Sequence, residues 1–327
     1  MRRIRRPAAP QPAAIAPSAA EEEEEEEKWH ECSSELDYEE GAVAAPLLLS
    51  PGGPLLPIEP LDEDEELPPL PDNYPVPERA RSEALRALRS LILAAPDATE
   101  VAALEDRSPA TLTRFLRARD FDARVAAALF LDHRAWRRSF GWAVPGSSVP
   151  QRYIANGTIC LQALSRHGRP LLVIVVRRHT LEGREMESTR QFIIHTMDRI
   201  MDAQRPGGQF LVLVDFEGLS RKSADVKALI ACFEILQKGY PERVKHLWFA
   251  EPPALFWGLW QAIKPFVAPK TKEKIVFLYG KAVADTLRAH FNAEDVPVEY
   301  GGTGQLRPIH PGPCVWEQQG AQRRRKY

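Results

Sequence analysis

The sequence lacks a run of apolar residues long enough to cross a bilayer, although 44% of its 327 residues are hydrophobic. A membrane-spanning helix needs roughly 18 or more consecutive apolar residues, so we expect no integral membrane segment. Cysteine is scarce too, and the four cysteines stand far apart without a CxxC pair: Cys32, Cys160, Cys232 and Cys314. This spacing favours a reducing compartment over a disulfide or zinc framework, and the cytoplasm is the expected location.

Motifs of catalysis are also missing. The sequence contains no GxSxG, no glycine-rich phosphate loop and no HExxH, and its histidines are dispersed without metal-ligand spacing. We expect each histidine to lie at the surface or in a satisfied core position. These absences predict a protein that is not an enzyme and that holds no metal.

Charge is divided unevenly along the chain, although the formal net charge is only −2. Residues 1–80 contain 20 acidic and 6 basic residues, so the remainder carries 25 acidic and 37 basic ones. The acidic part includes a glutamate run from Glu21 to Glu27 and a cluster from Asp62 to Glu66, and it holds 14 of the 29 prolines. Such a composition cannot offset the entropy of ordering, so we predict a disordered tail over residues 1–79. The tail is either a solubilising spacer or a competitor that folds back on the basic domain.

Two short basic segments occur near the ends of the sequence. Four arginines between Arg2 and Arg6 precede an alanine-rich stretch. Acidic residues follow too soon for a typical transit peptide, so organellar import is the less favoured interpretation. The segment from Arg323 to Lys326 is compatible with contact to an anionic membrane, with a nuclear-localisation patch or with a solvated terminus.

Helical periodicity predicts a small α-helical unit over residues 80–145. Leucine and isoleucine recur at helical spacing from Ser82 to Ala95, and a second helix is expected to open at Thr111–Phe115. A third helix is expected from Ala123 to Phe140, with apolar residues along one side. Three helices therefore make up the predicted N-terminal unit.

Residues 146–305 alternate between apolar runs typical of strands and helical patterns, which predicts an α/β domain with a mainly parallel sheet. We expect helices on one face of the sheet and a single lid on the other, with a cleft between sheet and lid. Residues 306–327 are then a C-terminal extension. The expected strands are Thr158–Ala163, Pro170–Val176, Phe210–Asp215, Val244–Phe249 and Ile275–Tyr279, and the expected helices are Ser188–Ala203, Val226–Lys238 and Ala282–Phe291.

The segment between the last two expected strands is unusually apolar for a connecting helix. It opens at Pro252 and closes near Pro265, and a hinge is expected at each end. A helix with apolar residues nearly all round must be buried or must cover an apolar surface. We predict a lid that hides its aromatic side chains in water and offers them to a membrane when open. Its gate residues are Leu255, Phe256, Trp257, Trp260 and Ile263.

The motifs around this lid occur in a familiar order. YPER precedes a strand, the aromatic helix ends in KPF, and a Pro-Thr-Lys stretch leads to the next strand. In this order the chain resembles the CRAL-TRIO lipid-binding family, which includes phosphatidylinositol/phosphatidylcholine transfer proteins. The resemblance covers about two thirds of the chain, and it implies a gated hydrophobic cavity for a lipid. It extends through RFLRARDFD (Arg114–Asp122), GRPLLVIVVRR (Gly168–Arg178), LVLVDFEGLS (Leu211–Ser220) and VPVEYGG (Val296–Gly302).

In family members that bind phosphatidylinositol, the headgroup is held by the Glu of YPER, by Thr and Lys after KPF and by an Arg of the LRAR segment. The resemblance thus implies a headgroup site made of Arg119, Glu242, Thr271 and Lys274, with Arg243 beside it. Lys and Arg can neutralise a phosphodiester, Thr can donate to its oxygens, and a carboxylate can accept from inositol hydroxyls. The alternative is that Glu242 and Arg243 cap the preceding helix and that the neighbouring lysines form a solvated face.

Two departures from the family pattern bear on the ligand. Asp120 stands where transfer proteins usually have Lys, which predicts a lower affinity for phosphatidylinositol. The positions that hold choline phosphate in some members are all apolar here, and an unpaired buried phosphate costs several kcal/mol. We therefore expect a more apolar second cargo, such as a sterol, an isoprenoid or a fatty derivative, and not phosphatidylcholine. The expected cavity-lining residues are Leu161, Leu172, Phe210 and Val212, although alternation along a strand can point some of them into the core.

These features together predict a lipid-binding or lipid-transfer protein that extracts phosphatidylinositol from a membrane and holds it in a gated cavity. The alternative is a non-transferring sensor or scaffold that presents phosphatidylinositol to a lipid kinase or a protein partner in phosphoinositide signalling. In either case we expect a monomer that is peripheral and transient on anionic membranes, without a nucleic acid partner. No cofactor is expected apart from the bound lipid.

Overall fold

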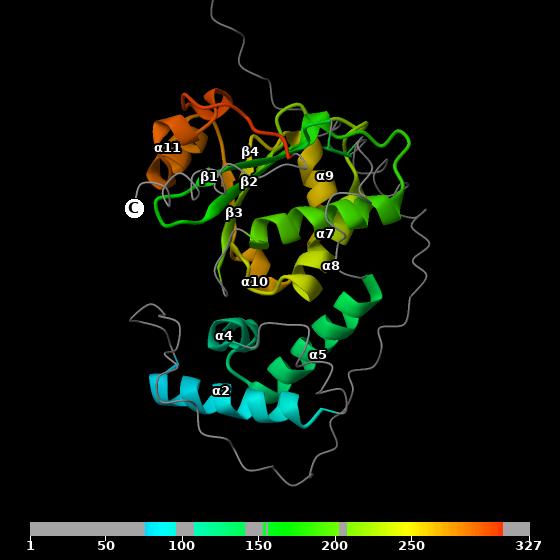
Figure 1. Ribbon diagram of the computed structural model, residues 1–327. Coiled ribbons are helices and arrows are strands. Elements are labelled where there is room, and N and C mark those ends of the chain that lie inside the picture. The colour runs from blue at the N-terminus through cyan, green and yellow to red at the C-terminus, as the bar shows by residue number, and fades with distance from the viewer. Residues whose placement is uncertain (1–75, 96–107, 141–152, 155, 203–207, 310–327) are drawn as a thin grey trace, which may run out of the picture.

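The computed structural model describes residues 76–95, 108–140, 153–154, 156–202 and 208–309. The predicted acidic tail, except for its last four residues, and the segment from Arg323 to Lys326 lie outside the described residues. No helix within the described ranges combines the length and the apolar content that a bilayer span requires. Three helices, which lie together below the sheet in Figure 1, form the predicted N-terminal unit around one apolar cluster: α2 (Glu78–Leu93), α4 (Pro109–Ala118) and α5 (Ala123–Phe140).

Two of these helices begin earlier than their apolar patterns predict. The first starts at Glu78 and not at Ser82. The second starts at Pro109, because the Ser108 side chain accepts a hydrogen bond from the Thr111 N–H and proline suits the first helical position. The start signal of α4 is therefore the Ser-Pro pair, which apolar periodicity does not detect.

The α/β domain is built on a five-stranded sheet with the order β1-β2-β3-β4-β5. The last four strands are parallel, and β1 pairs antiparallel with β2, so the predicted fold is confirmed. The strands are β1 (Ile159–Leu164), β2 (Pro170–Val175), β3 (Phe210–Asp215), β4 (Val244–Ala250) and β5 (Ile275–Leu278). The helices are α7 (Met186–Asp202), α8 (Val226–Gly239), α9 (Ala254–Ile263), α10 (Pro269–Lys272) and α11 (Lys281–His290).

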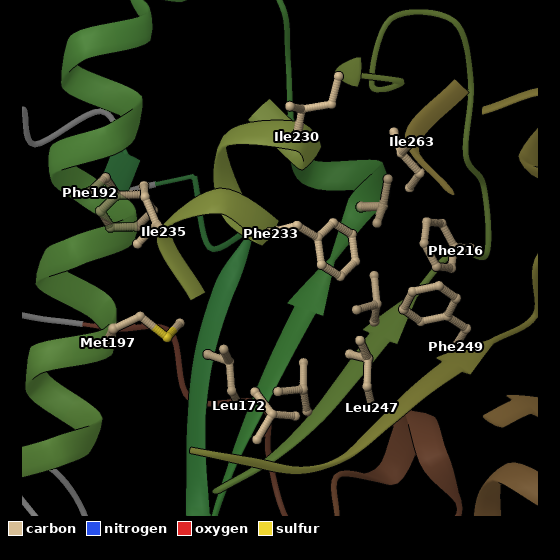
Figure 2. Packing of buried hydrophobic residues seen from close by; sticks show 14 of the residues in the cluster. Leu172, Phe192, Met197, Phe216, Ile230, Phe233, Ile235, Leu247, Phe249 and Ile263 are labelled. Carbon is tan, nitrogen blue, oxygen red and sulfur yellow. The ribbon is translucent and has the colours of Figure 1, made fainter. Parts of the chain in front are cut away.

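Helices cover both faces of this sheet, and α9 does not lie where the sequence suggests. Helices α7, α8 and α9 pack together on one face, and α11 packs on the other. Figure 2 shows Phe233 of α8 and Leu247 of β4 pointing into the space between the helices and the sheet. The expected lid therefore shares its face with α7 and α8. The reason is the strand order: strands β2 to β5 are added in one direction, and right-handed crossovers then place every connecting helix on the same face.

Polar contacts join the N-terminal unit to the turn that follows α8. Arg114 Nη1 donates to the Pro241 carbonyl at 2.9 Å. Arg137 forms two hydrogen bonds to the Asp198 carboxylate, at 2.6 and 3.1 Å, and its guanidinium lies over the ring of Tyr240. The Tyr240 hydroxyl donates to the same carboxylate. These contacts hold the end of α4 beside the YPER turn.

Candidate functional site

Four of the five predicted headgroup residues meet at one pocket of about 390 Å³, called the polar pocket below. Arg119 comes from the end of α4, and Glu242 comes from the turn between α8 and β4. Thr271 lies in α10, and Lys274 directly precedes β5. Figure 1 shows α10 facing α4, so segments far apart in the sequence contribute to one site.

Two ion pairs lie in this pocket. Lys274 Nζ is 3.0 Å from Glu242 Oε2, and both side chains are largely buried. Lys270 Nζ is 2.7 Å from Asp120 Oδ1, and it also donates to the Arg117 carbonyl at 2.8 Å. Each lysine is therefore held by a carboxylate from a different element of the fold.

The two carboxylates occupy unusual backbone positions. Asp120 has a φ of 51° and Glu242 a φ of 56°, in the left-handed region that residues other than glycine seldom adopt. A third such residue, Glu251 at 50°, directly precedes the Pro-Pro start of the lid. Strained backbone of this kind persists where the surrounding structure enforces it, and it is concentrated at functional sites.

The polar pocket has the donors and acceptors for a phosphorylated polyol. Arg119 and Lys274 can donate to phosphate oxygens, the Thr271 hydroxyl can donate or accept, and Glu242 can accept from hydroxyl groups. Arg243 is not among the residues that line this pocket. Its Nη1 donates to the Gly208 carbonyl at 2.9 Å, which ties the YPER turn to the start of β3.

Helix α9 lies closed on the sheet. Phe256 and Ile263 are fully buried, Trp260 is 9% exposed, and Leu255 is half-buried. The ring of Phe256 lies 4.6 Å from that of Phe216 and 5.6 Å from that of Phe249.

Trp257 differs from the other gate residues, because 44% of it is exposed. The centroid of its ring lies 5.2 Å from those of both Phe256 and Phe277. The prediction that a closed lid hides Trp257 is therefore wrong. Neighbouring residues on a helix point about 100° apart, so Phe256 can face the sheet while Trp257 faces outward.

A second pocket, of about 130 Å³ and with an almost entirely apolar surface, lies between the sheet and the helices; we call it the apolar pocket. Only Leu172 of the four predicted cavity residues lines it. Leu161, Phe210 and Val212 are on the same face of the sheet but are buried in the packed cluster. Sites for drug-sized ligands usually measure about 300–1,000 Å³, so this pocket does not hold two acyl chains as it stands. The cleft expected between the sheet and the lid is thus small, because α9 is packed directly onto the sheet.

A buried polar junction borders the apolar pocket. Asp225 caps α8 by accepting from the Ala228 N–H at 2.9 Å, and His179 Nε2 and Arg184 Nη1 each lie 3.0 Å from its carboxylate. Burial alone would raise the pKa of Asp225, but the hydrogen bonds from His179 and Ala228 and the charge of Arg184 lower it. Asp225 is therefore ionised and fully engaged. Within the described ranges, no group of three or more His, Cys, Asp or Glu side chains is placed to bind a metal ion.

Helix α8 borders both pockets. Leu229 and Cys232 line the apolar pocket, and Leu236 and Gln237 line the polar pocket. Burial raises the pKa of Cys232 to about 12, so its thiol stays protonated and acts as an apolar wall. Cys232 and Leu236 are about one helical turn apart, roughly 6 Å along the axis. The two pockets therefore lie about one turn apart along α8.

Several lining residues are not identified by the sequence analysis. Phe192 and Met197 of α7 line the apolar pocket, and their signal is the amphipathic spacing of that helix. Leu259 of α9 also lines it. Nothing in the sequence pairs Lys270 with Asp120, because the two residues meet only through the fold.

Comparison with known proteins finds a family model that matches part of the chain. The model of the CRAL/TRIO domain matches residues 155–302. The CRAL-TRIO domain-containing protein YKL091C of Saccharomyces cerevisiae is 26% identical over 257 residues, which cover 70% of this chain and 79% of that protein. The phosphatidylinositol transfer protein CSR1 of Eremothecium gossypii is 27% identical over 207 residues, which cover 58% of this chain and 46% of that protein.

A solved structure shares the fold. The crystal structure of Sfh5 matches with a TM-score of 0.58 and 16% identity, covering 77% of this chain and 99% of that chain. The present chain spans only 30% to 47% of the length of four curated relatives that it matches.

Proposed function

We propose that the chain binds phosphatidylinositol, with the inositol phosphate in the polar pocket, from the premise that residues 155–302 match the model of the CRAL/TRIO domain. The domain is a lipid-binding domain, and one relative is named as a phosphatidylinositol transfer protein. The observation that carries the proposal is the convergence of Arg119, Glu242, Thr271 and Lys274 on a single pocket. The proposal assigns no catalytic step and no cofactor.

The acyl chains, in this proposal, run along α8 into the space beneath α9. They fit only when α9 moves off the sheet, since the apolar pocket measures about 130 Å³. The hinges are the strained backbone at Glu251 and the 3₁₀ turn Lys264–Phe266 that follows α9. Trp257 is already exposed, so it makes the first contact with a membrane interface, where Trp is favoured. An apolar second cargo would occupy the same space, against Leu172 and the other apolar residues that line the apolar pocket.

The test is lipid loading of the purified full-length chain, measured by native mass spectrometry and by extraction after incubation with vesicles. The double variant Arg119→Ala with Lys274→Ala removes two phosphate donors, each worth about 1.5–3 kcal/mol, so phosphatidylinositol loading should fall by more than about a hundredfold. Loading of an apolar cargo should remain.

A matched control removes the same charge outside the polar pocket. The double variant Arg124→Ala with Lys272→Ala changes residues that do not line it, so loading should stay at the wild-type level. Equal loss of phosphatidylinositol in both double variants would contradict the proposed headgroup site.

Retention without transfer is the second candidate function, and the packing of α9 favours it. Release of a lipid requires Phe256 and Trp260 to leave their contacts with Phe249. A sensor that presents phosphatidylinositol to a lipid kinase or a protein partner would retain its lipid, whereas a transfer protein would exchange it between donor and acceptor vesicles. An exchange assay with labelled phosphatidylinositol therefore decides between the two functions.

A further inference from the structure

The charge of the polar pocket is set by carboxylates as well as by cations. Arg119, Lys270 and Lys274 line it together with Asp120 and Glu242, which gives three cations, two carboxylates and a net charge of +1. Each carboxylate already bonds one lysine, Asp120 at 2.7 Å and Glu242 at 3.0 Å. An anion that enters the pocket must therefore compete with these carboxylates for the lysine N–H groups.

Building on the proposed function, we propose that Asp120 restricts the polar pocket to a headgroup with one negative charge, a phosphodiester, and excludes inositol lipids that carry further phosphates. A phosphodiester balances the net charge of +1. A phosphomonoester on the inositol ring adds about −1.5 to −2 charges at neutral pH. The described lining residues offer no further cation to neutralise that charge.

Asp120 acts through its charge and contributes little to the stability of the fold. Its carboxylate is 85% exposed, and exposed ion pairs stabilise a folded protein only weakly. Lys270 keeps its hydrogen bond to the Arg117 carbonyl without Asp120. Removing the carboxylate therefore frees one lysine charge for a ligand and removes one repulsive charge.

The substitution Asp120→Asn isolates this effect. The backbone at Asp120 has a φ of 51°, and asparagine is among the residues that tolerate this left-handed conformation. The Asn variant therefore keeps the turn between α4 and α5 and changes only the charge. Glu273→Gln is the matched control, because Glu273 is an exposed residue of the same segment as Lys274 but does not line the polar pocket.

In the experiment, the full-length chain is incubated with phosphatidylcholine vesicles that contain equal amounts of phosphatidylinositol and phosphatidylinositol 4-phosphate. The ratio of these two lipids bound to the protein is then measured. The wild type and Glu273→Gln should prefer phosphatidylinositol by at least about tenfold. Asp120→Asn should lower this preference by about tenfold, because one unit of charge at short range near a protein surface changes an affinity by about that factor. A ratio measured within one sample is insensitive to the fraction of unfolded protein. Inorganic phosphate at a concentration equal to that of the lipids should not displace the bound phosphatidylinositol.

Each contrary result has a distinct meaning. If the wild type binds phosphatidylinositol but Asp120→Asn leaves the lipid ratio unchanged, the inference is overturned and the proposed function stands. Displacement by inorganic phosphate would also overturn it, since the pocket would then accept any phosphate. If the wild type loads no phosphatidylinositol and the Arg119 and Lys274 double variant behaves like the wild type, the inference and the proposed function both fail.

Discussion

Gly239 shows how a single residue positions the polar pocket. It is the last residue of α8, and the indole ring of Trp136 from α5 fills the space where a side chain would stand. The Trp136 ring also meets the Tyr240 ring edge to face, with 6.3 Å between their centroids. This close approach brings the N-terminal unit against the YPER turn, and with it the end of α4 that carries Arg119.

The substitution Gly239→Ala should destabilise the fold at this contact. A Cβ at Gly239 would lie 2.5 Å from two ring carbons of Trp136, and overpacking of this kind costs about 1–3 kcal/mol. Urea unfolding measures the change. Lys238→Ala is the control, because it changes the neighbouring residue without adding a side chain at the contact with Trp136. Its free energy of unfolding should stay within about 0.5 kcal/mol of the wild-type value. Similar stability of the two variants would show that Trp136 moves aside freely.

Asp225 makes stability depend on pH in the acidic range. The pKa of Asp225 in the folded protein is lowered below the ordinary 3.8. The stability that the ionised carboxylate contributes is therefore fully present above the ordinary pKa and is lost as the pH falls through the lower pKa of the folded state. The stability advantage of the wild type over Asp225→Asn should therefore be constant from about pH 7 to 5 and shrink below about pH 4. Urea unfolding across this range measures it, and a difference that does not change with pH would contradict the assigned contacts.

At the scale of elements, α9 divides its aromatic residues between two roles. Phe256 and Trp260 face the sheet, where they pack on Phe249, and Trp257 faces outward. The sequence predicts the helix and its apolar character correctly, because both follow from local composition. Which side of α9 faces the sheet depends on the rotation of the helix about its own axis. The sequence pattern does not determine this rotation when nearly every side of the helix is apolar.

Two substitutions on α9 should separate these roles. Phe256→Ala removes a fully buried ring and should cost about 3–5 kcal/mol of unfolding free energy. Trp257→Ala should change stability by less than about 1 kcal/mol, yet weaken binding to vesicles by roughly tenfold, because it removes an exposed interfacial side chain. Thermal or urea unfolding and vesicle sedimentation measure the two effects. Unchanged vesicle binding of Trp257→Ala would exclude this residue from membrane contact.

At the scale of the whole molecule, charge is separated between an acidic segment and a basic remainder. The basic part includes the polar pocket, whose lining carries three cations. Opposite charges on one chain attract over about 10 Å at moderate salt, and this attraction competes with binding to anionic lipids. The acidic segment is therefore a candidate regulator of membrane contact.

Deletion of residues 1–75, which leaves α2 intact, should strengthen binding to anionic vesicles at low salt. The gain should disappear as salt rises, because screening weakens the competition. A full-length control in which Glu21–Glu27 are replaced by Gln should show part of the same gain without a change of length. Vesicle sedimentation at two salt concentrations measures the effect. Equal binding of both forms at low salt would identify the segment as a spacer.

The sequence by itself determined most of the elements and four of the residues that meet in the polar pocket. A continuous apolar run places β3 at Phe210–Asp215 as predicted, and the motifs that resemble those of the CRAL-TRIO family identify Arg119, Glu242, Thr271 and Lys274. These features are readable because periodicity and motif spacing are local properties of the chain. The roles of the four residues in headgroup binding stay predictions.

Only the tertiary structure decided the face that α9 covers, the small volume beneath it and the ion pair between Asp120 and Lys270. The face depends on the order in which strands join the sheet, and the volume depends on how side chains of the sheet, α7, α8 and α9 pack together. The ion pair joins residues that are 150 positions apart in the sequence. Each of these features arises from contacts between segments distant in sequence, so no local pattern of residues records it.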